Sequence, residues 1–164
     1  MKIKKTIIVL LLCFLPVAPS FAQKVGEALS AWKEGYMDIH HINTGCGECA
    51  YIIFPDGTTM LVDAGENKAD NPRHVLPKPN AGRTPGEWIV DYIQAMAPDQ
   101  NQKLDYALIT HFHSDHMGGV FKTKNESGRY YNTGIITVAE NIRINKLVDR
   151  GFPVSYTHLT LPTI

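Results

Sequence analysis

Residues 104–119 read LDYALITHFHSDHMGG, and this stretch indicates both the fold class and the chemistry. The first part, 104–110, is mostly apolar, as is typical of a strand that is buried on both faces of a sheet. The second part, 111–116, holds three histidines and an aspartate, and Gly118 and Gly119 then allow close backbone approach. Open sheets usually place their sites at the carboxyl ends of strands, so we expect a functional site here.

The spacing of these histidines predicts a metal site. His111 and His113 project to the same side of an extended segment, so both imidazoles can bind one ion. Asp115 and His116 follow a bend, and we expect them to face a neighbouring point and to serve a second ion. A chance His-x-His-x-Asp-His arises on the order of once in a thousand such chains. A purely structural alternative is that Ser114 or Asp115 caps a short helix.

Strand patterns precede this stretch. Residues 36–43 alternate in character, 49–54 form a second apolar run, and 59–63 form a third. Pro-Asp-Gly at 55–57 is a strong turn signal, so the second and third strands should form a hairpin. The polar segment 66–82 is rich in proline and reads as a surface loop.

A helix should begin after Thr84. Thr84 is a good N-cap, Pro85 suits the first helical position, and Glu87 completes a capping-box pattern. The helix should end before Pro98. Its expected apolar face is Trp88, Val90, Ile93 and Met96.

Length and composition limit the classes of protein. The 164 residues suit one domain, and the 44% hydrophobic content supports a packed core. Because 16 basic residues balance 16 acidic ones, no basic patch favours nucleic acid. Three cysteines are too few for a disulfide-framework protein. Of these, Cys46 and Cys49 suggest a local disulfide or two unpaired thiols, because a redox pair would stand at a helix start.

Both ends of the chain read as segments outside the fold. Residues 1–22 have three lysines, an apolar run and a Ser-Phe-Ala end, which is the layout of a secretory signal peptide. The expected protein is therefore exported, periplasmic or secreted, and meets a membrane only during export. Residues 154–164 contain VSYTHLTLPT, which resembles a translated sequencing adaptor, so native sequence should end near Pro153. The domain would then be an amino-terminal part spanning 23–153.

Two motifs together resemble a known family. Residues 107–120 resemble the signature of the metallo-β-lactamase fold hydrolases, and 61–65 (LVDAG) resemble the family's earlier strand-end motif. Within that superfamily the chain is most similar to the extracytoplasmic domain of ComEC/Rec2 competence proteins, because 45–48 (GCGE) match a Gly-x-Gly-[Asp/Glu] turn. The resemblance covers about 38–120 well and 142–153 more loosely. It implies an α/β (α+β) fold that is the first half of an αββα sandwich.

The resemblance also implies residue roles. His111, His113, Asp115 and His116 become metal ligands, and Asp115 is also the catalytic proton acceptor. Asp63 becomes a residue behind the ligands that orients their loop. Two zinc ions would then generate a metal-bound hydroxide, although Mn²⁺ or Fe²⁺ also suit such ligands.

The family completes its site with further histidines and a bridging aspartate, but residues 120–153 contain no histidine. This favours an amino-terminal fragment that is inactive alone. For the full-length protein we expect hydrolysis of a phosphate ester or phosphodiester. The alternatives are a secreted β-lactamase, or another ester or amide hydrolase of this fold, and a non-catalytic binding protein that retains it. Nothing in the charge supports nucleic acid as the substrate.

Overall fold

The computed structural model describes only part of the chain: residues 26–66, 72, 75, 79–98, 102–119 and 128–149. Contacts divide the chain into two units, residues 1–30 and 31–164, and every helix and strand described lies in the second. The expected signal peptide (1–22) and adaptor translation (154–164) lie outside the described residues. The described helices are all too short or too polar to cross a bilayer.

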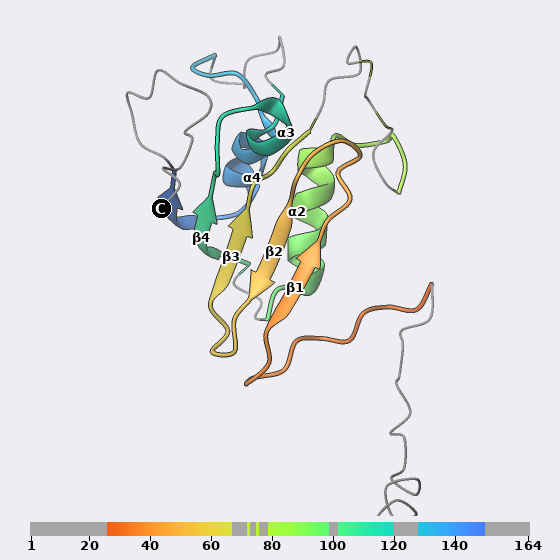
Figure 1. Ribbon diagram of the computed structural model, residues 1–164, viewed down its shortest axis with the longest axis vertical. Helices are drawn as coiled ribbons and strands as arrows, with labels where there is room; N and C mark the ends of the chain where they lie inside the picture. Colours follow the sequence, from red (N-terminus) through yellow and green to blue (C-terminus); the bar gives the residue numbers. More distant parts are fainter. Residues whose placement is uncertain are drawn as a thin grey trace, which may run out of the picture. The chain divides into compact units, whose positions relative to one another are not determined.

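A single five-stranded sheet forms the framework, with its strands in the order in which they occur in the chain (Figure 1). The first pairs, β1 with β2 and β2 with β3, are antiparallel, whereas β3 with β4 and β4 with β5 are parallel. The parallel pairs require crossover connections, and helices supply them. The strands are β1 (Asp38–His41), β2 (Ala50–Ile53), β3 (Thr59–Val62), β4 (Leu104–Leu108) and β5 (Ile144–Val148).

The β2–β3 hairpin forms as the turn signal predicts. Tyr51 pairs with Leu61 in the register of the hairpin. The Phe54 N–H donates to the Thr58 carbonyl at 2.8 Å, and Gly57 adopts a φ of 82° that a glycine accepts without strain. A short local signal therefore sets the register of the strand that leads into the 61–65 motif.

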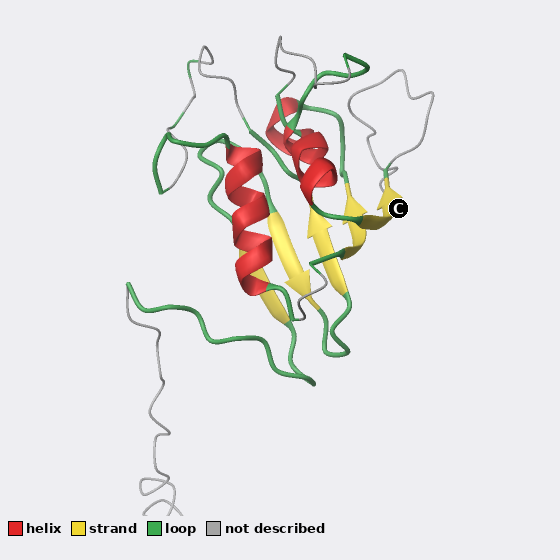
Figure 2. Ribbon diagram, turned by 180° about the vertical axis from the view of Figure 1, so that it is seen from behind, coloured by secondary structure: helices red, strands yellow, loops and turns green. Residues whose placement is uncertain are grey.

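Two helices, α2 (Pro85–Met96) and α4 (Gly134–Asn141), cover one face of the sheet (Figure 2). The capping box of α2 forms as expected, with the Thr84 hydroxyl accepting from the Glu87 N–H and the Glu87 carboxylate accepting from the Thr84 N–H. A third helix, α3 (Ser114–Met117), is a single turn after β4. The mixed α/β class expected from the sequence is thus confirmed.

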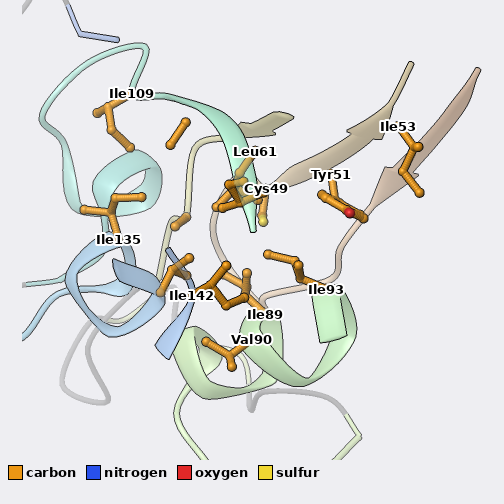
Figure 3. Close-up of a cluster of buried hydrophobic side chains, with 14 residues drawn as sticks. Cys49, Tyr51, Ile53, Leu61, Ile89, Val90, Ile93, Ile109, Ile135 and Ile142 are labelled. Carbon is orange, nitrogen blue, oxygen red and sulfur yellow. The ribbon is translucent and has the colours of Figure 1, made fainter. Parts of the chain in front are cut away.

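The hydrophobic core lies between the sheet and these helices (Figure 3). The strands contribute Tyr51, Ile53 and Leu61, which are all 0% exposed. From α2 come Ile89 and Ile93, which are also 0% exposed. Burial of such side chains contributes roughly 1.5–3 kcal/mol each, so this layer is the main source of stability. It holds the carboxyl ends of β3 and β4 in fixed positions.

Two expectations about burial were wrong. Tyr106 in β4 is 37% exposed, because the described helices cover only one face of the sheet, so β4 is not buried on both faces. In α2 the buried side chains include Ile89, which the expected face omitted, whereas Trp88 and Met96 are only half-buried. The capping box sets where α2 begins, but tertiary packing decides which of its side chains are buried against the sheet.

Candidate metal centre

Two loops meet at the carboxyl edge of the sheet. The parallel register pairs Val62 with Leu108, so β3 and β4 end at the same level. Residues 63–66 continue from β3, and residues 109–117 continue from β4. The two sequence motifs, far apart in the chain, are therefore neighbours in space.

Backbone hydrogen bonds hold these loops together. The Ala64 N–H donates to the His116 carbonyl at 2.7 Å, and the Glu66 N–H donates to the Ser114 carbonyl at 2.9 Å. The β1–β2 loop joins them, because the Glu48 N–H donates to the Asp115 carbonyl at 2.8 Å. Such main-chain bonds position the histidine-bearing segment independently of its side chains.

Gly65 allows this close approach. A Cβ atom at position 65 would collide with the backbone carbonyl of Asp115. Gly118 has a similar role one turn later, with a φ of 97° and the backbone nitrogen of Gly134 directly against it. The expectation that Gly118 permits close backbone passage is confirmed.

His111 and His113 face each other as the extended spacing predicts. The Nε2 atom of His111 lies 3.2 Å from the Nδ1 atom of His113. Two nitrogens that bind one tetrahedral zinc ion at 2.0–2.1 Å are separated by about 3.3 Å. The observed separation therefore fits two ligands of a single ion.

Asp115 lies with this pair. His111, His113 and Asp115 each offer a ligand atom, and these atoms lie within 4.8 Å of one another. The sequence pattern instead predicts that Asp115 shares an ion with His116. Asp115 Oδ2 is also 3.9 Å from His116 Nε2, and the ring of His116 lies against that of His111, with 3.8 Å between the ring centres. Two imidazoles and a carboxylate are a donor set that suits Zn²⁺, so the residues present fit the implied metal.

His116 is oriented by Asp63. Its Nδ1–H donates to Asp63 Oδ2 at 2.8 Å, which leaves Nε2 as the nitrogen with a lone pair. Asp63 is 3% exposed and adopts a left-handed φ of 58°, a conformation that aspartate tolerates better than most residues. The structure thus places Asp63 behind the histidine cluster, as the family resemblance implies.

Thr110 completes this network and was missed from the sequence. Its N–H donates to Asp63 Oδ1 at 2.8 Å, and its hydroxyl donates to Asp63 Oδ2 at 2.7 Å. Asp63 therefore holds the histidine-bearing segment both before His111 and at His116. A threonine beside a histidine carries no signal of its own, and only the pairing of β3 with β4 reveals the contact.

The pKa of His111 lies below its ordinary value. Loss of solvent is the largest cause, and the neighbouring rings of His116 and His113 add to it. A lowered pKa favours the neutral imidazole, which is the form that metal ligation would require.

Glu66 is a second residue that sequence reasoning missed. Its side chain is 1% exposed, and Oε2 accepts from the Gly86 N–H in the first turn of α2 at 3.2 Å. Burial raises the pKa of this carboxyl to about 7, although the Gly86 hydrogen bond opposes the shift. Glu66 therefore links the metal-site loop to the amino end of α2.

Two minor expectations are also decided. The N-cap of α3 is His113, with no side-chain cap, so neither Ser114 nor Asp115 is the N-cap. Cys46 and Cys49 do not form a disulfide, and Cys49 is a buried thiol whose pKa is raised, chiefly by burial. A thiol with a raised pKa is a poor nucleophile, which argues against a redox pair.

Comparison with known families agrees with this geometry. A family model described as the metallo-beta-lactamase superfamily matches residues 43–128, which is more than half of the 164-residue chain. The chain therefore belongs to the metallo-beta-lactamase superfamily, whose members are generally hydrolytic metalloenzymes. No curated protein and no solved structure matches the chain.

Proposed function

We propose that this chain carries the metal-binding segment of a zinc-dependent hydrolase. His111, His113 and Asp115 would hold one ion, and His116 would supply a ligand to a second. The observation that supports this most directly is the convergence of the first three ligand atoms within 4.8 Å. Mn²⁺ and Fe²⁺ also suit a mixed nitrogen and oxygen donor set, so zinc is the first ion to test.

The protein residues have separate tasks in this proposal. A bound divalent cation would lower the pKa of a coordinated water and polarise the bond to be cleaved. Asp115, with 51% of its side chain exposed, is accessible to accept a proton from that water. Asp63 and Thr110 hold the ligand segment in place without contacting substrate.

For the substrate we propose a phosphate ester or phosphodiester. The support is the similarity of 45–48 to the turn of ComEC/Rec2-like domains, together with the position of Glu48 beside Asp115. A second candidate is a β-lactamase, which the superfamily and an exported location both allow. A third is a non-catalytic protein that retains the fold and part of the site.

One experiment separates these three functions. The full-length parent protein is used, because the amino-terminal fragment is expected to be inactive alone. Its zinc content is measured after dialysis, and hydrolysis is assayed with bis(4-nitrophenyl) phosphate and with a chromogenic cephalosporin. We expect bound zinc and turnover of the phosphodiester only. Turnover of the cephalosporin alone would favour the β-lactamase, and zinc without turnover of either compound would favour a binding protein. The absence of bound zinc would contradict the metal-site proposal itself.

We also propose that the protein is exported, with residues 1–22 as the cleaved signal. The support is the lysine-rich start, apolar run and small-residue end of that segment. Fractionation of expressing cells, with amino-terminal sequencing of the product, tests this. A mature protein that begins at Gln23 outside the cytoplasm is expected, and an intact Met1 in the cytoplasm would contradict it.

A further inference from the structure

A cleft of about 390 Å³ lies between helix α2 and the end of strand β1, and no metal-centre residue lines it. One wall is formed by Pro85, Trp88, Asp91 and Tyr92, which recur every three or four residues and so share one stripe of α2. The opposite wall is residues 41–44. This stripe does not include the buried core residues of α2, so core packing does not account for its aromatic character.

The two aromatic side chains are held firmly. The Trp88 Nε1–H donates to the Asn80 carbonyl at 3.0 Å, and the Arg83 guanidinium lies 5.5 Å from the centre of the indole ring. The Tyr92 hydroxyl forms a 3.0 Å hydrogen bond with His40 Nδ1, and the two rings pack edge to face. Because their polar groups are already bonded, both rings offer the cleft mainly apolar surface at little further entropic cost.

The charge of the lining selects the ligand. Asp91 is the only acidic side chain among the described residues that line the cleft, and neither lysine nor arginine lines it. Arg83 lies against Asp91, with its guanidinium 2.7 Å from Asp91 Oδ1, so the pair is close to neutral. Apart from His41, no described lining residue has a side chain that can carry a positive charge toward an anionic group. A neutral ring with an N–H or O–H group can instead stack on the aromatic wall and donate to the Asp91 carboxylate.

We propose that this cleft binds an uncharged planar aromatic group that carries a hydrogen-bond donor. Its volume is at the lower end of the range of small-molecule pockets, which are mostly apolar with a few placed polar groups. It therefore suits a single or fused ring rather than a polymer.

The cleft is near the candidate metal centre along the β1–β2 loop. Thr44 lines the cleft, and Glu48 donates its N–H to the Asp115 carbonyl. Four residues span at most about 14 Å, so a ring in the cleft and a bond at the metal centre can belong to one substrate. This step rests on the proposed hydrolase function: the cleft holds the aromatic part of the substrate.

Binding is tested first without any metal, with adenosine as a neutral ring that carries an amino donor. The chain has two tryptophans, so Trp32→Phe leaves Trp88 as the only indole reporter. Saturable quenching of Trp88 by adenosine, but not by ribose, is expected. Its absence would overturn the proposal.

Variants in the Trp32→Phe background then locate the binding site. Tyr92→Ala should weaken adenosine binding at least tenfold, and Tyr92→Phe should bind as the parent does because it keeps the ring. Tyr36→Ala is the matched control, since Tyr36 is 68% exposed and does not line the cleft. Asp91→Asn removes the charged acceptor for the ligand's N–H group and should weaken adenosine binding severalfold. Because Asp91 is not a core residue, this variant replaces Tyr92→Ala in the test if Tyr92→Ala does not fold. Equal affinity in Tyr92→Ala and Tyr36→Ala would place adenosine elsewhere.

Hydrolysis distinguishes the two linked proposals. With the zinc-loaded full-length parent protein, kcat/KM is compared for 4-aminophenyl 4-nitrophenyl phosphate, whose ring carries an N–H donor, and for methyl 4-nitrophenyl phosphate. The ratio of the first to the second should exceed ten and fall several-fold in Tyr92→Ala. An unchanged ratio would overturn the substrate role of the cleft. If neither ester is hydrolysed while adenosine still binds, the hydrolase proposal fails and the ring-binding site stands.

Discussion

Asp63 Oδ2 lies 2.8 Å from Nδ1 of His116, although the two residues are 53 positions apart in the chain. The same oxygen accepts a hydrogen bond of 2.7 Å from the Thr110 hydroxyl. One buried carboxylate thus sets the orientation of an imidazole and the position of the segment that carries the other candidate ligands. Metal affinity should therefore depend on a residue that does not itself bind the metal.

Replacement of Asp63 by asparagine should weaken zinc binding by roughly 10–100-fold. The amide keeps the shape of the carboxylate but has only one oxygen. Either the Thr110 N–H, or the Thr110 hydroxyl and His116 together, therefore lose their acceptor and face an NH2 group instead. Competition with a chromophoric chelator measures the affinity. Asp56→Asn, at an exposed turn, is the control and should bind zinc like the wild type. Equal affinities in the two variants would remove Asp63 from the site.

Replacement of Asp115 by alanine should abolish most turnover in the complete enzyme and lower its zinc content, while the fold persists. The side chain is 51% exposed, so its removal leaves no cavity. Circular dichroism, zinc stoichiometry and phosphodiester hydrolysis are measured together, with Asp56→Ala as the matched surface control. Retained turnover in Asp115→Ala would contradict the role assigned to this carboxylate.

Glu66 should make the stability of the protein depend on pH. Its pKa in the folded chain, about 7, lies above its ordinary value of 4.5, so the native state favours the protonated form. The resulting stabilisation is complete below about pH 4.5 and is lost as the pH rises through 7, a difference on the order of 3 kcal/mol.

Glu66→Gln tests this assignment, because the amide is isosteric and does not titrate. The free energy of unfolding in urea, measured for both proteins from pH 5 to pH 8, should fall less steeply with pH in the variant. Comparing the two proteins removes the contribution of His40, whose pKa is lowered by burial and which titrates in both. Parallel curves would show that Glu66 is not the titrating group.

Gly118→Ala should destabilise the chain by about 2–4 kcal/mol, since a left-handed backbone and a steric collision add together. Gly128 offers a matched control, because its φ of 69° is also left-handed but nothing lies within 4 Å of an added Cβ. Gly128→Ala should therefore lose only about 1 kcal/mol. The free energy of unfolding in urea is measured for both variants. Equal decreases would show that the close contact of Gly118 with Gly134 does not contribute to stability.

Features that depend on nearby residues could be predicted from the sequence. The capping box of α2 needs only Thr84 and Glu87, and the β2–β3 turn needs only residues 55–57. The imidazoles of His111 and His113 lie on the same side because side chains alternate in direction along an extended chain. In each case the interacting groups are a few residues apart, so local geometry is sufficient.

Features that depend on packing direction were predicted less well. The apolar pattern of α2 was compatible with Trp88 in the core, but the structure buries Ile89 and turns Trp88 to the cleft. The apolar run of β4 suggested two buried faces, yet Tyr106 is 37% exposed. Hydrophobicity says that a side chain prefers burial, but not which neighbour is present to bury it.

The sequence by itself determined the types and spacing of the candidate ligands and the secondary structure that carries them, because these rest on local backbone geometry. Only the tertiary structure decided that Thr110 joins Asp63 and that Glu66 becomes a buried carboxyl against α2. It also decided that an aromatic stripe on α2 faces the end of β1. These contacts join residues from separate elements, and they exist because the parallel pairing of β3 with β4 and the packing of the helices bring those elements together.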